Sequence, residues 1–163
     1  MLRAKLTALP AAVLLLASLG SVARAKPIVA LKLSAMLVEH QANGAERLVP
    51  VEKTALRPGD VIRYIIVASN TGSNAAKDLV PAGRVPAGTV YVVGSASSPT
   101  ATAEFSLDGG KTWSAVPTVK IRTQAGDVVK RAVPSAYTAV RWVGAKALAP
   151  NAADAFAYEV TVK

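Results

Sequence analysis

Apolar and polar residues alternate along much of the chain after residue 26, with the period of two that is typical of β-strands. The clearest examples are segments 29–37 and 156–163, in which every second residue is apolar. Runs rich in β-branched and aromatic residues predict further strands at 61–67, 89–93, 103–107, 113–116 and 137–143. Segments 95–103 and 124–135 are less regular and are expected to be loops or edge pieces, and 151–155 is expected to be a loop.

Clusters of Gly, Pro, Asn and Asp separate these strands. They lie at 57–60, 69–74, 81–83, 86–88 and 149–151, and each is typical of a turn. Asp108-Gly109-Gly110 is expected to form the turn of a hairpin between 103–107 and 113–116, because glycine adopts left-handed conformations without a Cβ clash. The pattern therefore predicts an all-β, two-sheet antiparallel sandwich of about seven to nine strands.

The first 25 residues have a different pattern. Arg3 and Lys5 precede an apolar run of about 14 residues, and Ala23-Arg24-Ala25 supplies the small residues of a cleavage site. The run is shorter than the roughly 20 residues of a membrane-spanning helix. We therefore expect a cleaved signal peptide, with an uncleaved anchor as the alternative, and an exported protein with no stable membrane insertion. The expected organisation is a signal peptide at 1–25, an N-terminal strand and connecting loop at 26–46, and a sandwich domain at 47–163.

Composition narrows the possible functions. The chain has no Cys, which excludes a thiol enzyme and a cysteine-ligated metal site. The formal charge of +9 falls to +6 without Arg3, Lys5 and Arg24, and the remaining basic residues are scattered. A nucleic-acid-binding face would cluster its charge, so no nucleic-acid partner is expected.

The order of turns and strands from 56 to 96 resembles the bacterial conserved-repeat family known as domain of unknown function eleven. The matching features are Pro-Gly-Asp at 58–60, Asn-Thr-Gly at 70–72, Pro-Ala-Gly at 86–88, Val-Arg-Trp at 140–142, Leu-Ala-Pro at 148–150 and the strand 156–162. The family usually has an Asp shortly before its Pro-Ala-Gly turn. This chain has Pro-Ala-Gly-Arg at 81–84 in that region, so no role of that carboxylate carries over. The resemblance implies an immunoglobulin-like sandwich in an exported or cell-surface protein without known enzymatic activity.

A candidate contact site lies at 106–113, which has the Ser-x-Asp-x-Gly-x-Thr-Trp spacing of the Asp-box found in sialidase-type β-propellers. Asp108, Lys111 and Trp113 are the residues that could contact a ligand or partner, and a polysaccharide is the ligand that such a Trp would suit. A propeller needs several four-stranded blades, which one box in this short chain cannot build. A structural turn is the favoured interpretation.

No catalytic, cofactor or metal site is expected. The only histidine, His40, lies in a polar stretch and is interpreted as a solvated loop residue. Asp60, Asp78, Asp108 and Asp127 lie near turns, and turn capping explains them more simply than calcium binding does. The other aromatic residues could form a sugar-stacking face, but their alternation with aliphatic residues favours a place in the core.

The N-terminal strand offers an interaction surface through Val29, Leu31, Leu33 and Leu37, which share one face. It could pair within its own chain or be donated to a neighbour's sheet edge. We therefore expect a non-catalytic structural or interaction module of the cell envelope, whose partners are envelope or surface proteins, a second copy of the chain included. A carbohydrate-binding or envelope-polymer-binding module is the alternative, and a small hydrolase is the least favoured hypothesis.

Overall fold

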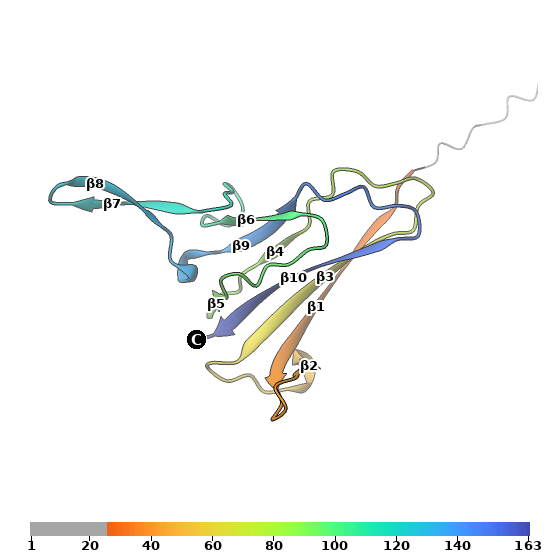
Figure 1. Ribbon diagram of the computed structural model, residues 1–163, viewed down its shortest axis with the longest axis horizontal. Helices are drawn as coiled ribbons and strands as arrows, with labels where there is room; N and C mark the ends of the chain where they lie inside the picture. Colours follow the sequence, from red (N-terminus) through yellow and green to blue (C-terminus); the bar gives the residue numbers. More distant parts are fainter. Residues whose placement is uncertain (1–25) are drawn as a thin grey trace, which may run out of the picture.

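The computed structural model describes residues 26–163, so the predicted signal peptide at 1–25 lies outside the described residues. Strands of this part of the chain form a five-stranded antiparallel sheet in the order β2-β1-β3-β10-β5 and a three-stranded sheet in the order β4-β9-β6 (Figure 1). The larger sheet consists of β1 (Val29–His40), β2 (Glu46–Pro50), β3 (Val61–Asn70), β5 (Thr89–Tyr91) and β10 (Ala153–Val162). The smaller sheet consists of β4 (Ala82–Arg84), β6 (Thr102–Ser106) and β9 (Ala139–Val143).

The core lies between β9 of the smaller sheet and β3 and β10 of the larger one. Trp142 on β9 is fully buried, and its ring lies 5.6 Å from the ring of Phe156 and 6.2 Å from that of Tyr158, both on β10. Gly83 on β4 packs directly over Tyr158, where a Cβ atom would lie 2.5 Å from the ring. Tyr91 and Tyr137 are also buried, which confirms a core role for these aromatic residues. Aromatic packing therefore holds the two sheets together.

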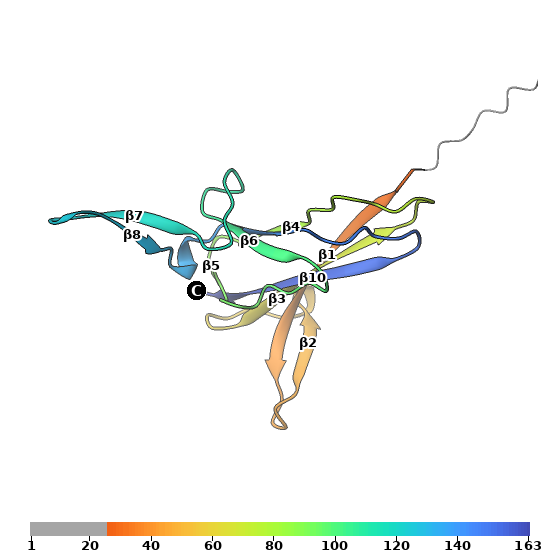
Figure 2. The same cartoon turned by 45° about the horizontal axis from the view of Figure 1, so that its top comes forward.

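A third pair of strands projects from the sandwich. β7 (Thr118–Thr123) and β8 (Gly126–Arg131) form an antiparallel hairpin that extends away from both sheets (Figures 1 and 2). Every residue of β8 is exposed, and only Val119 of β7 packs against the core. Two short 3₁₀ turns, η1 (Val51–Lys53) and η2 (Pro134–Ala136), follow β2 and β8.

The all-β, two-sheet antiparallel sandwich predicted from the sequence is confirmed. Residues 26–163 contain ten strands, of which eight belong to the two sheets and two to the hairpin. The predicted strands at 29–37, 61–67, 103–107, 137–143 and 156–163 correspond to β1, β3, β6, β9 and β10. No helix within 26–163 is long and apolar enough to cross a bilayer.

Two sequence-based predictions of local structure, for 113–116 and 151–155, are wrong. Segment 113–116 makes only a bridge between Ser114 and Phe105, because the Val116 amide donates to the Ser114 hydroxyl and Pro117 has no N–H to extend the pairing. Segment 124–135 was expected to be a loop or an edge piece, and it contains β8, an exposed strand that pairs only with β7, so the edge-piece alternative is confirmed. Segment 151–155 is not a loop throughout, because β10 begins at Ala153 and pairs along nearly the whole length of β3. Tertiary pairing there overrides the low strand preference of alanine.

Candidate functional site

The first half of β1 forms an open edge of the larger sheet. β1 pairs with β3 of the same chain from Val29↔Asn70 to Leu37↔Ile62. On its other side, β2 pairs only with the stretch from Met36 to His40. Residues 29–35 therefore have no strand beside them on that side within the described part of the chain. We call residues 29–35 the β1 edge.

The backbone hydrogen-bonding groups of the β1 edge point outward. At Ile28, the residue before β1, the amide N–H bonds Asn70 Oδ1 at 3.2 Å and the carbonyl accepts the Thr71 amide at 2.8 Å, both on the β3 side. Because backbone groups point alternately to either side of a strand, those of Val29, Leu31 and Leu33 point away from β3. Unpaired groups of this kind are a template for another strand.

The β1 edge also has an uncovered apolar face. Leu31 and Leu33 lie opposite Ala68 and Ile66 of β3, and directly paired residues share a face of the sheet. Ala68 and Ile66 are buried in the core, yet Leu31 is 59% exposed and Leu33 60%. The cover of the smaller sheet therefore ends between β3 and β1.

The four residues singled out from the sequence in this strand have different environments. Val29, Leu31 and Leu33 are exposed, whereas Leu37 is buried beside Ile62. The structure thus divides β1 into an exposed half, which could meet another molecule, and a buried half, which holds the strand in its own sheet.

Asn70 anchors the start of β1. Its buried side chain accepts hydrogen bonds from the amides of Ile28 and Gly72, and its Nδ2 donates to the carbonyls of Asn74 and Leu148 at 2.8 and 2.9 Å. Gly72 lies against the same segment, since a Cβ atom there would clash with the backbone nitrogen of Ile28. In the sequence, the Asn-Thr-Gly at 70–72 predicts a turn but not this anchoring role.

The second candidate site, the loop at 106–113, is tightly bonded to itself. Asp108 Oδ1 accepts the Ser106 hydroxyl at 2.7 Å and the amides of Lys111 and Thr112 at 3.0 and 2.9 Å, and Oδ2 accepts the Thr112 hydroxyl at 2.7 Å. These bonds, those from Thr112 foremost, hold the pKa of Asp108 well below its ordinary value. The carboxylate is therefore ionised at neutral pH, and both of its oxygens accept hydrogen bonds from its own turn.

The side chain of Trp113 is also engaged in contacts within the protein. Its Nε1 donates to the Gly110 carbonyl at 3.0 Å, and the guanidinium of Arg141 lies 4.7 Å from the centre of its ring. Arg141 is held there by Glu104, whose Oε2 accepts its Nε at 2.8 Å. The structure brings Asp108, Lys111 and Trp113 together in one turn. The two groups that would recognise a sugar, the Asp108 carboxylate and the Trp113 side chain, are already engaged in contacts within the protein. This arrangement favours the structural interpretation.

The remaining candidates are isolated. His40 is exposed at the end of β1, and no group of three or more His, Asp or Glu side chains in residues 26–163 is placed to hold a metal ion. Asp60 caps its turn by accepting the Arg57 amide at 2.7 Å. The predicted capping role is confirmed for Asp60 and Asp108.

Comparisons with known proteins found no match. No family model, no curated protein and no solved structure matches the chain. The resemblance to domain of unknown function eleven therefore stays a prediction.

Proposed function

We propose that this protein is a non-catalytic interaction module, exported to the cell envelope or beyond, that associates with a second copy of itself through the β1 edge. The observation that carries the proposal is the coincidence, over one stretch of strand, of unpaired backbone groups and an uncovered apolar face. Envelope or surface proteins with a similar free strand are the other partners of this surface. The signal-like N-terminal pattern and the resemblance to a family of surface proteins support the export.

An antiparallel pair of β1 edges is self-complementary. With Leu31 of one copy opposite Leu31 of the other, Val29 lies opposite Leu33 and Ala30 lies opposite Lys32. This register joins only apolar residues on the inner face, and it pairs residues 29–33 of the two copies. A register centred on Lys32 would place two like charges directly opposite each other, which destabilises a pair of strands. The sequence of the edge therefore selects the register centred on Leu31.

The association is expected to be weak. Complete burial of a leucine contributes about 1.5–3 kcal/mol, and Leu31 and Leu33 are already partly covered. Loss of translational and rotational freedom on association costs about 4–15 kcal/mol. The free energy gained from the apolar contact and from the new ladder of backbone hydrogen bonds exceeds this cost only slightly. We therefore expect a dimer at high micromolar concentration rather than at nanomolar concentration.

The polysaccharide-binding alternative has less support. It depends on a free face and a free N–H group of Trp113, and both Arg141 and Gly110 are in contact with that side chain. No second observation in residues 26–163 favours it.

Sedimentation velocity over a concentration series tests the proposal with the chain that begins at Lys26. Leu31→Lys places a charge on each strand at the centre of the proposed pair, and should abolish the dimer. Because Leu31 is already largely exposed, the monomer should stay folded. Val129→Lys is the matched control, since Val129 is an apolar strand residue that is 60% exposed but lies on the hairpin.

The proposal requires the native chain and Val129→Lys to dimerise alike while Leu31→Lys stays monomeric. A native chain that is still monomeric at about 1 mM would refute it, because association weaker than that is at the level of non-specific contact. A Leu31→Lys dimer as strong as the native one would also refute it.

A further inference from the structure

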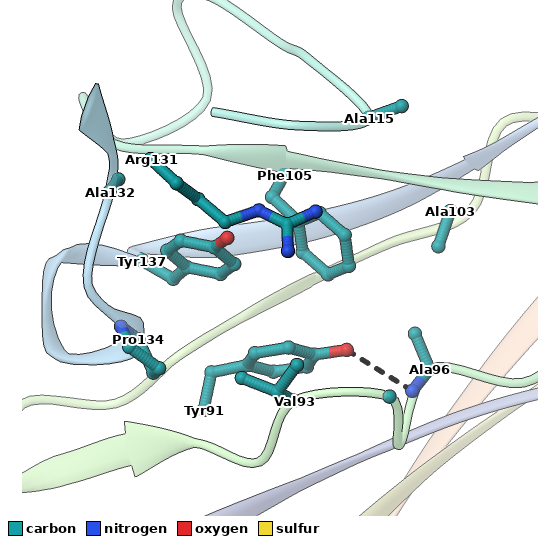
Figure 3. Close-up of a pocket in the computed structure, with 11 residues that line it drawn as sticks. Tyr91, Val93, Ala96, Ala103, Phe105, Ala115, Arg131, Ala132, Pro134 and Tyr137 are labelled. Atoms are coloured by element: carbon teal, nitrogen blue, oxygen red, sulfur yellow. Dashed lines mark hydrogen bonds between the residues drawn. The ribbon is translucent and has the colours of Figure 1, made fainter. Parts of the chain in front are cut away.

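A cavity opens at the end of the sandwich opposite the start of β1. Its volume is about 340 Å³, and four segments line it: the end of β5 with the following loop, β6, the loop from β6 to β7, and the end of β8 with the connection to β9 (Figure 3). Residues far apart in the sequence thus build one site, at the place where the β7–β8 hairpin joins the sandwich.

Aromatic rings form a rigid wall of this cavity. Tyr91 and Tyr137 are stacked with their ring centres 5.5 Å apart, and Phe105 lies 5.0 Å from Tyr91 and 5.1 Å from Tyr137. Tyr91 is buried, and its phenolic oxygen accepts the Ala96 amide at 3.2 Å. Because both tyrosines are buried and packed against Phe105, the wall exists before any ligand arrives.

Small side chains leave the space open. Ala96, Ala103 and Ala115 line the cavity facing the rings, where larger apolar residues would fill it. The volume is about twice that of the roughly 150 Å³ cavity that takes up a benzene molecule. The space therefore suits one aromatic ring with a short chain attached.

Arg131 supplies the one charge. It is the last residue of β8, and it lines the cavity together with Phe105 and Tyr137, as labelled in Figure 3. Within residues 26–163 this guanidinium has no ion pair and no hydrogen bond, whereas Arg63 and Arg141 are each held by glutamates. An unpaired guanidinium beside an apolar wall favours a carboxylate, which it can bind through two parallel N–H groups.

Nothing in the lining opposes an anion. None of the residues that line the cavity is acidic. Burial raises the pKa of Tyr91, so its phenol stays neutral at physiological pH. We propose that this cavity binds a small free carboxylate that carries one aromatic ring, with the ring against Tyr91, Tyr137 and Phe105 and the carboxylate on Arg131.

Titration with 3-phenylpropionate, followed through backbone amide shifts of the chain from Lys26, tests this site. A ligand of this size that fills the cavity should bind with a dissociation constant in the low-millimolar range or tighter. The largest shifts should fall on the amides of Ala96, Ala103 and Ala132. The neutral isostere 3-phenylpropionamide should bind about tenfold more weakly, because it lacks the charge-assisted hydrogen bonds to Arg131.

Two variants distinguish the contribution of the Arg131 charge to binding from that of the shape of the cavity. Arg131→Gln should lower the affinity for the carboxylate about tenfold and leave that for the amide unchanged. Arg122→Gln, on the same hairpin but away from the cavity, is the matched control and should change neither affinity. Ala103→Leu should fill the space and remove binding of both probes.

The proposal fails if the carboxylate and the amide bind equally well to the native chain, or if Arg131→Gln binds the carboxylate as the native chain does. Shifts that spread over the surface instead of the cavity would also refute it. So would the absence of saturable binding at about 20 mM, far above the dissociation constant expected for a ligand of this size.

Discussion

At the scale of single residues, the buried polar side chain of Asn70 joins several separate segments of the fold. Buried polar groups are costly unless they are hydrogen-bonded, and Asn70 uses both its oxygen and its nitrogen. Its partners lie in three segments: the residue before β1, the loop after β3, and the loop before β10. One side chain therefore joins the β1 edge to the rest of the fold.

Asn70→Ala should destabilise the protein by about 2–3 kcal/mol, because it leaves several buried backbone groups without a partner. Chemical denaturation of the chain from Lys26 measures this change. Asn43→Ala is the matched control: Asn43 caps one exposed amide, that of Ala45, and its loss should cost less than about 0.5 kcal/mol. Equal effects of the two substitutions would show that Asn70 is not an anchor.

The turn that contains Asn70 can be predicted from the sequence, whereas the long-range contacts of its side chain cannot. The Asn-Thr-Gly at 70–72 predicts a turn, and a turn is present. The sequence cannot tell that the Asn side chain reaches Leu148, because that contact spans 78 residues and depends on how the loops meet. The same holds for the cavity, whose rings from Tyr91, Phe105 and Tyr137 belong to three different segments.

At the scale of elements, the strands that pack on the core were predictable and the projecting hairpin was not. β3 and β10 carry long runs in which apolar residues face the core, and this alternation is visible in the sequence. In β7, Val119 and Ile121 alternate with Lys120 and Arg122, but the adjacent Val128 and Val129 break the pattern in β8. Because β8 has no buried face, no alternation is required of it.

Removal of the outer part of the hairpin should leave the sandwich intact. Replacement of residues 121–128 by an Asn-Gly turn retains Val119, the only β7 residue packed on the core, and Arg131. The melting temperature should change by no more than about 4 °C, because the removed residues stabilise only each other. A loss of cooperative unfolding in a calorimetric scan would instead show that the hairpin is part of the core fold.

At the scale of the whole molecule, the main feature is the mismatch between a five-stranded and a three-stranded sheet. The smaller sheet covers the inner face of β3 and β10 but not that of the β1 edge. Soluble proteins usually protect an edge strand with charges, prolines or a covering segment. Here the inner face has two exposed leucines, and Lys32 is the only charge on the β1 edge. Self-association through the β1 edge explains both the unequal size of the two sheets and the lack of protection at this edge.

Amide hydrogen exchange at two protein concentrations shows whether the β1 edge pairs with a second copy of the chain. The amides of Lys32 and Ser34 point toward β3 and should exchange slowly in dilute and in concentrated solution. Those of Leu31 and Leu33 point outward, so they should exchange rapidly in the dilute monomer and slowly in the dimer at about 1 mM. Exchange at Leu31 and Leu33 that stays rapid at the higher concentration would show that the β1 edge remains unpaired and does not mediate self-association.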